Sequence, residues 1–189
     1  MTLQVGRLSA VVALLALAVV PASATTVRHV DTRGLVESSQ EIVIGRVAQV
    51  RAAWNEKHTK IYTEVEIEVD SSLKGEAARR LTLRQLGGEV DGVRYTVPGC
   101  ATFRPGEEAL LFVWRDRTGR AQVNALAQGK FDISRDAATG RRVVQRSEAG
   151  LAFRDVKSLQ RAAEGMPAPR IELDEMVAEI ERLVAEGRK

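Results

Sequence analysis

The clearest hydrophobic pattern in this chain is a strict alternation of side chains over residues 61–70. A period of two places successive side chains on opposite faces of a β-strand, and it is typical of a strand with one buried face. The core-facing row is Ile61, Thr63, Val65, Ile67 and Val69, and the opposite row is Tyr62, Glu64, Glu66, Glu68 and Asp70. We therefore expect a half-buried strand here, with an acidic row in solvent.

A second strand, over residues 79–86, is expected to pair with the first. Leu81 and Leu83 form its apolar row, while Arg80 and Arg84 lie on the other face. Antiparallel pairing sets these arginines opposite the acidic row, and opposite charges across a ladder contribute about 0.2–1 kcal/mol per pair. The pairing gives the acidic row a structural role in place of a metal site, because alternate residues of a strand lie about 6.6 Å apart.

The remaining β-rich segments are short and are separated by turn signals. Residues 109–114 are apolar throughout, which predicts a strand buried on both faces. Residues 41–50 form another strand, and Gly45 inside it is typical of a bulge or sharp bend. Further strands are expected over 93–97, 121–126, 131–134 and 142–146, with turns at 55–58, 87–92, 98–99, 104–107, 116–119 and 136–140.

Helical patterns occur near both ends of this β-rich region. Residues 32–40 predict a short helix with Thr32 as its N-cap, and residues 155–164 predict another inside a linker over 151–170. Apolar residues then recur at helical spacing over 171–189, which indicates an amphipathic helix packing on the sheet: Leu173, Met176, Val177, Ile180, Leu183 and Val184. The predicted fold is mainly β, a small Greek-key, OB-like barrel over 25–150 with a short N-terminal helix and a C-terminal amphipathic helix.

The first residues read as a targeting segment rather than as part of the fold. Arg7 supplies the positive charge, residues 8–20 are apolar apart from Ser9, and small residues precede Thr25. This pattern is that of a secretory signal peptide over 1–24, cleaved between Ala24 and Thr25. The apolar stretch is shorter than the roughly 20 residues of a membrane span. We therefore expect a periplasmic or extracellular protein with no stable membrane span after cleavage.

Charge and cysteine content narrow the function classes. The chain has 28 Lys and Arg against 25 Asp and Glu, a mild excess, and only 4% aromatic residues. No basic cluster is interleaved with aromatic residues, so a nucleic-acid partner is not expected. Cys100 is the only cysteine, which excludes an internal disulfide in an exported chain. Stability must come from burial and hydrogen bonding.

Five stretches of the chain carry a resemblance to a known fold family. They are SQEIVIGRV, IYTEVEIEVDSSLKGE, GGEVDGVRYTVPG, FRPGEEALLFV and AQGKFDI, within residues 38–133. They resemble a set of uncharacterised exported bacterial proteins. Their strand pattern is similar to the OB-fold of tissue inhibitors of metalloproteases and of netrin-like domains. The resemblance implies a similar barrel.

The resemblance implies a fold, but it does not imply the inhibitory activity of that family. Inhibitors of that class bind a protease zinc through an N-terminal cysteine held by disulfides, whereas the mature chain is expected to begin at Thr25. His29 and His58 are the only histidines, and their spacing does not suit a zinc site. We expect no catalytic set, no metal site and no cofactor. Glycines 87, 88 and 92 lack the following Lys-Ser/Thr and helix of a phosphate loop.

The loops are the remaining candidates, because binding residues concentrate in loops on rigid scaffolds. The leading expectation is an exported, non-enzymatic module that binds a protein or peptide, with an oligomeric state that the sequence leaves open. The alternatives are an extracytoplasmic enzyme or redox protein that uses Cys100, and a metalloprotease-inhibitor-like protein. We expect Cys100 itself to be a partly buried, unreactive thiol. The candidate partner-binding residues are Trp54, Gly87, Gly88, Asp91, Cys100 and Arg104.

Overall fold

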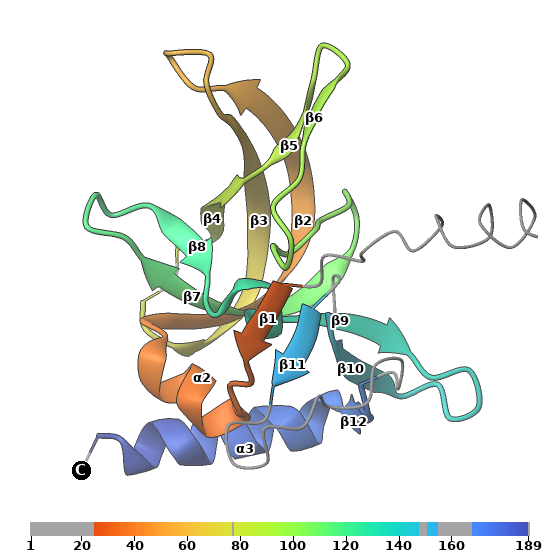
Figure 1. The fold of residues 1–189 in the computed structure, drawn as a ribbon. Helices are drawn as coiled ribbons and strands as arrows, with labels where there is room; N and C mark the ends of the chain where they lie inside the picture. The colour runs from red at the N-terminus through yellow and green to blue at the C-terminus, as the bar shows by residue number, and fades with distance from the viewer. Residues whose placement is uncertain (1–24, 77, 148–150, 155–167, 189) are drawn as a thin grey trace, which may run out of the picture.

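A closed barrel forms the centre of the computed structural model, which describes residues 25–76, 78–147, 151–154 and 168–188 (Figure 1). β2 pairs antiparallel with β3 and β7, β3 with β4, and β7 with β8. A parallel bridge between Leu83 of β4 and Ala121 of β8 closes the ring. The mainly β, OB-like barrel predicted from the sequence is confirmed. Its five strands are β2 (Glu41–Trp54), β3 (Ile61–Lys74), β4 (Arg80–Leu86), β7 (Glu108–Arg115) and β8 (Ala121–Val123).

The other elements extend or cover the barrel. The sheet continues from β7 through β9 (Lys130–Arg135) and β10 (Arg142–Arg146) to β12 (Arg170–Glu172). β5 (Gly88–Val90) and β6 (Val93–Tyr95) form a separate hairpin, and β1 (Thr25–Arg28) pairs in parallel with β11 (Leu151–Arg154). Two helices, α2 (Thr32–Ser38) and α3 (Leu173–Glu186), lie together beneath the barrel in Figure 1.

The barrel interior holds one of two apolar clusters. Alternate residues of β7, Ala109, Leu111 and Val113, point into it and are fully buried. They meet Val65 and Ile67 of β3, which belong to the row expected to face the core. The period-two prediction for residues 61–70 is therefore confirmed.

The second cluster lies between the outer face of the sheet and the helices. Leu110 and Phe112 of β7 point into it, so residues 109–113 are buried on both faces as the sequence predicts. Trp114, the last residue of the predicted run, is instead 37% exposed. The apolar stripe of α3 covers this face, which confirms the predicted amphipathic helix: Leu173, Met176, Ile180, Leu183 and Val184 are buried in the cluster. The helix begins at Leu173 because the preceding residues 170–172 pair with β10 as β12.

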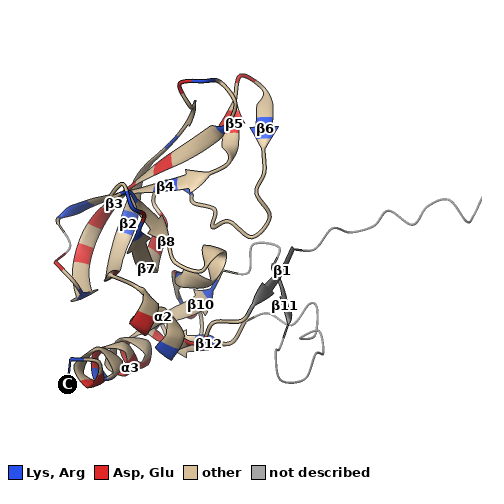
Figure 2. Ribbon diagram, turned by 60° about the vertical axis from the view of Figure 1, so that its left-hand side comes forward, with Lys and Arg blue, Asp and Glu red and all other residues tan. Residues whose placement is uncertain are grey.

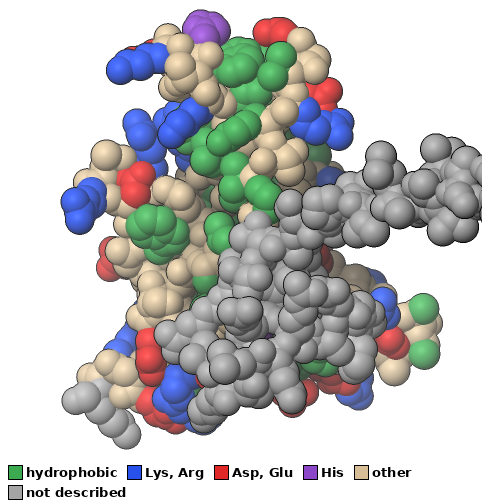
Figure 3. All heavy atoms as spheres, in the orientation of Figure 1, with side chains coloured by type: hydrophobic (Ala, Val, Ile, Leu, Met, Phe, Trp, Pro, Cys, Tyr) green, Lys and Arg blue, Asp and Glu red, His purple; other side chains and the backbone are tan. Residues whose placement is uncertain are grey.

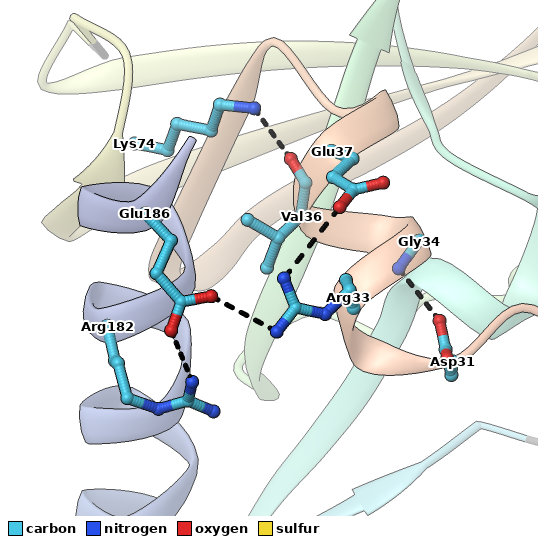
Figure 4. A network of polar contacts seen from close by, with 8 residues as sticks. All are labelled: Asp31, Arg33, Gly34, Val36, Glu37, Lys74, Arg182 and Glu186. Carbon is cyan, nitrogen blue, oxygen red and sulfur yellow. Dashed lines mark hydrogen bonds and ion pairs between the residues drawn. The ribbon is translucent and has the colours of Figure 1, made fainter. Parts of the chain in front are cut away.

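A polar network joins α2 to α3 and to the end of β3 (Figure 4). Lys74 donates from Nζ to the carbonyl oxygens of Val36 and Ser39, each at 2.6 Å, and so satisfies carbonyls at the end of α2. Burial lowers the pKa of Lys74, partly offset by the nearby carboxylate of Glu37. On the other side, Glu186 of α3 accepts hydrogen bonds from Arg33 at 3.1 Å and from Arg182 at 2.6 Å.

This network predicts a pH-dependent contribution to stability. Hydrogen bonds from Arg33 and Arg182 lower the pKa of Glu186. Because the pKa is depressed in the folded state, the stabilisation is present above the unfolded-state pKa and is lost as pH falls through the folded-state pKa. E186Q should therefore lower the urea midpoint at neutral pH and match the unsubstituted protein in strong acid.

The control for this measurement is E181Q, which changes an exposed carboxylate of α3 that has no ion-pair partner among the described residues. E181Q should leave the urea midpoint unchanged at neutral pH. An E186Q effect that stayed constant down to strong acid would contradict the role assigned to the charge of Glu186.

The charged rows of β3 and β4 face each other as predicted. Figure 2 shows acidic and basic segments side by side on β2, β3 and β4. Glu64 lies opposite Arg84, and Glu68 lies opposite Arg80. Arg80 forms an ion pair at 3.3 Å with Glu66, its diagonal neighbour. Arg84 instead lies over the ring of Tyr62, 4.3 Å from its centroid, in a cation–π contact. The predicted strand pairing is therefore confirmed, but only Arg80 forms an ion pair with the acidic row.

Gly45 lies at the irregularity that the sequence indicates. The β2–β3 register shifts between Ile44 and Gly45. A Cβ atom on Gly45 would lie 2.4 Å from the carbonyl oxygen of Glu68 and 2.8 Å from Cγ2 of Ile67. The two strands therefore approach each other closely at a point where no side chain fits.

Substitution of Gly45 by alanine should lower the free energy of unfolding by about 1–3 kcal/mol, because the strands must separate to admit the methyl group. Urea denaturation followed by circular dichroism measures the change. The control T82A, at an exposed position of β4, should change it by no more than about 0.5 kcal/mol. Equal effects of the two substitutions would contradict the steric argument.

Several predicted boundaries need correction. Asp31, and not Thr32, is the N-cap of α2, since its Oδ1 accepts a hydrogen bond from the Gly34 N–H at 2.8 Å. β2 and β3 are longer than expected because their ladder runs, through three register shifts, from Ile42 opposite Lys74 to Trp54 opposite Ile61. β8 ends at Val123 because the backbone turns into a 3₁₀ helix at Leu126–Gly129. β6 ends at Tyr95, and β10 has its predicted bounds.

Two predictions fall outside the described residues: the signal peptide over 1–24, with Ala24, and the helix over 155–164. Thr25 is the first described residue and begins β1. The segment expected to be a linker contains β11 and the start of β12. Among the helices that the structure describes, none has the length and apolar content needed to cross a membrane.

Candidate binding groove

A hollow of about 650 Å³ lies beside the β5–β6 hairpin, and we call it the hairpin groove. Its walls come from β2, the end of β4, the hairpin and the loop over residues 96–103. Hydrophobic side chains gather in the upper middle of Figure 3, where Figure 1 places the hairpin beside β2 and β3. Its apolar lining includes Val50, Ala52, Leu86, Val97, Ala101 and Phe103.

Gly87 and Gly88 position the hairpin. Both have positive φ angles, 108° and 138°. The Gly87 N–H donates to the carbonyl of Ile61 at 2.9 Å, and Thr63 Oγ1 donates to the carbonyl of Gly87 at 2.7 Å. A Cβ atom on Gly88 would lie 2.5 Å from Thr63 Oγ1, so glycine allows the hairpin to lie directly on the barrel. These two residues therefore shape the groove rather than supply its chemistry.

The tip of the hairpin is a tight turn. Asp91 and Gly92 have φ angles of 52° and 76°, as the two central residues of a type I′ turn require. Across the hairpin, Arg94 lies opposite Glu89, and its Nε donates to Glu89 Oε2 at 2.8 Å. The turn sets the geometry of these two strands of only three residues each. The ion pair adds little to it, because its side chains are 73% and 52% exposed.

The outer edge of the hairpin is open. Among the described residues, β6 pairs with β5 alone. Val93 and Tyr95 of β6 are 49% and 40% exposed, the two most exposed large hydrophobic side chains of the described chain. An unpaired strand edge that carries exposed apolar side chains can pair with another chain. This edge and the groove beside it form one surface.

Gln85 is a groove residue that the sequence reasoning missed. It is 8% exposed, and its Nε2 has no hydrogen-bond partner among the described residues. Gln85 follows Leu81 and Leu83 on the buried face of β4. The alternation of the strand puts it at a position where an apolar residue is expected, and this was the sequence signal that could have identified it. A buried amide without a partner is rare and points to an exchange of hydrogen bonds with something outside the fold.

Cys100 also lines the groove, and its surroundings do not activate it. It is a free, half-buried thiol, and burial raises the pKa of that thiol. Neither histidine is among the groove-lining residues. A nucleophilic cysteine needs a lowered pKa or an adjacent base, and the residues that line the groove supply neither.

We expect iodoacetamide to alkylate Cys100 slowly in the folded protein at neutral pH. The rate should rise with pH and reach half its maximum at a higher pH than for the same thiol in the urea-unfolded chain, because the folded-state pKa is raised. Mass spectrometry of the labelled protein measures both rates. Faster alkylation of the folded than of the unfolded chain at neutral pH would instead support the redox alternative.

The structure brings together three of the six candidate residues. Gly87, Gly88 and Cys100 line the groove. Trp54 lies at the end of β2 and stacks on His58 with ring centroids 6.1 Å apart, and Asp91 lies at the hairpin tip. Neither lines the groove. Arg104 lines a second hollow, on the other side of the loop over residues 102–107.

No protein-family model and no curated protein sequence matches this chain. Within the part of the chain that the structure describes, no three His, Cys, Asp or Glu side chains gather to hold a metal ion. The fold and the groove therefore define the class of protein on their own: an OB-like barrel with an added hairpin at one end and a helical layer on its outer face.

Proposed function

We propose that this chain is an exported, non-enzymatic binding protein whose hairpin groove takes an extended peptide segment of a partner protein. The observation that carries the proposal is the open edge of β6 beside an apolar hollow of about 650 Å³. A peptide that adds to a sheet edge gains backbone hydrogen bonds, and pockets beside the edge select its side chains.

The geometry of the hairpin suits this mode of binding. In a hairpin with a two-residue turn, Val90 and Val93 form a hydrogen-bonded pair, so the N–H and C=O of Arg94 point away from β5. They are free to pair with an incoming strand. Val93 and Tyr95 flank Arg94 and would contact that strand through their exposed apolar surface. Gln85 offers an amide to a polar group that enters the groove.

Export rests on the sequence pattern at the N-terminus, with Arg7, the apolar stretch over 8–20 and the small residues before Thr25. The competing functions have less support. The raised pKa of Cys100 argues against a redox role. A metalloprotease-inhibitor-like role lacks a cysteine at Thr25. The binding role needs neither an activated thiol nor an N-terminal cysteine.

Selection from a phage-displayed library of random linear peptides tests the proposal. Peptides selected on residues 25–189 should lose affinity about tenfold, or about 1.4 kcal/mol, when Tyr95 is replaced by alanine. R94P should abolish binding because it removes the outward N–H, while R94A, which keeps that N–H, should bind. W114A is the matched control, because Trp114 is 37% exposed on β7 and does not line the groove.

Circular dichroism and urea midpoints must show that each variant is folded. The proposal fails if no peptide is enriched above background. It also fails if the selected peptides bind the Y95A and W114A proteins equally well, since the edge of β6 would then not be the binding surface.

A further inference from the structure

A second hollow, of about 560 Å³, lies between the loop over residues 102–108 and strands β9 and β10. We call it the basic hollow, because five of its lining residues are basic and three are acidic. The basic residues are Arg46, Arg104, Lys130, Arg135 and Arg142, and the acidic residues are Glu107, Glu108 and Asp132; Thr102, Ser134 and Ser147 add hydroxyl groups.

The three carboxylates are already paired within the wall. Glu108 forms ion pairs with Arg46 through Oε1 and with Arg142 through Oε2, the latter at 3.1 Å. Lys130, whose side chain is only 3% exposed, forms ion pairs with Asp132 and, at 3.1 Å, with Glu107.

Two guanidinium groups in the wall remain without a carboxylate. Among the described residues, Arg104 has no ion-pair partner, and Arg135 donates only to the carbonyl of Gly140, at 3.3 Å. Both side chains are exposed. The basic hollow therefore carries two positive charges in excess, on side chains that can reach a ligand.

The basic hollow adjoins the hairpin groove. Thr102 lines both of them. The next residue, Phe103, lines the groove, and Lys130 of the basic hollow lies over its ring, 5.1 Å from the centroid. One loop is thus the wall between an apolar hollow and a basic one, and a single extended segment can lie across it.

We propose that the basic hollow is an anionic subsite that binds a carboxylate of the same peptide segment, either an acidic side chain or the C-terminal carboxylate. This inference rests on the proposed function. It specifies the chemistry of the bound peptide, which has an apolar stretch followed or preceded by a carboxylate. Guanidinium groups bind carboxylates through paired hydrogen bonds.

The first arm of the test uses the selected peptides. Each Asp or Glu is changed to Asn or Gln, and the C-terminus is amidated, one change at a time. Fluorescence anisotropy should show that one of these changes weakens binding to the unsubstituted protein about tenfold. In the double variant R104Q/R135Q the same change should have no effect. R117Q, an exposed arginine in the β7–β8 turn that does not line either hollow, is the control.

The second arm needs no peptide. Acetate and inorganic phosphate are titrated separately into the folded protein, and the side-chain Nε–Hε signals of Arg104 and Arg135 are followed by NMR. Saturable shifts with acetate that disappear in R104Q/R135Q support the subsite. Saturation by phosphate with no response to acetate overturns the carboxylate assignment, and the absence of any saturable shift overturns the subsite.

The two arms separate the two proposals. Enriched peptides that bind equally well with and without every carboxylate leave the groove intact and overturn the anionic subsite. A library that yields no peptide overturns the proposed function, and the acetate titration then decides the subsite by itself.

Discussion

Replacing Phe112 by alanine should lower the free energy of unfolding by about 3–5 kcal/mol, the range for aromatic residues deleted from a close-packed core. Phe112 is completely buried in the layer between the sheet and the two helices. Its ring lies 5.7 Å from that of Phe131, centroid to centroid, at a tilt of 52°. The substitution removes this ring contact and leaves a cavity. The paired segments of β2 and β7, residues 41–46 and 108–113, cannot move together to close it.

Urea denaturation followed by circular dichroism measures the loss. W114A serves as the control on the same strand, because Trp114 is 37% exposed and its side chain should contribute much less. A loss below about 1 kcal/mol for F112A would mean that the helical layer adjusts freely to the missing ring. That result would contradict the close packing of α2 and α3 on the sheet.

Replacing Lys130 by methionine should lower the free energy of unfolding by about 3 kcal/mol, although methionine is apolar and of similar length. The Lys130 side chain is 3% exposed and neutralises Glu107, whose side chain is 24% exposed. Removing one partner of a buried ion pair leaves the other charge without compensation, which is more costly than removing both. The Glu107 oxygen that faces Lys130, Oε1, accepts no hydrogen bond among the described residues, so the ion pair with the ammonium group is the contact that it loses.

The double variant K130M/E107Q should recover part of the lost stability, since the carboxylate that it leaves without an ion pair, Asp132, is half exposed and solvated. D132N should cost less than about 1 kcal/mol, because the other partner of Lys130 is half exposed. If K130M were as stable as the unsubstituted protein, or if E107Q made it less stable, the ion pair would not be what holds Lys130 in place.

Part of the candidate site could be predicted from the sequence. Gly87 and Gly88 belong to the turn signal over residues 87–92, which made them candidate loop residues, and the structure shows that both have positive φ angles. Cys100 stood out as the only thiol. Their placement in one groove depends on how the 96–103 loop returns to the barrel, and no local pattern encodes that path.

Other site residues left little or no signal. Lys130 lies in the run AQGKFDI, where a lysine between turn and strand is normally exposed; it is buried because β9 pairs with β7 and Glu107 lies across from it. Arg135 is an ordinary strand-end arginine until the loop over residues 102–108 forms the opposite wall. Charges that gather from distant segments become a site only when the strands pair.

The sequence by itself determined the strands and helices with strong periodicity. The alternation over 61–70, the apolar run over 109–114 and the stripe from Leu173 to Val184 each set a buried face that any fold of this chain must cover. The irregularity at Gly45 followed from a different local signal, a glycine inside a strand. The local side-chain pattern decides such features because burying an apolar face lowers the free energy of the folded chain wherever the element packs.

Only the tertiary structure decided how those faces are covered. A single parallel bridge from Leu83 to Ala121 closes the barrel, and the hairpin lies on β2 and β3 because Gly88 permits close approach. Both hollows arise where the 102–108 loop crosses between β2, β9 and the hairpin. These contacts join residues far apart in the chain, and their free energy comes from packing rather than from local preference.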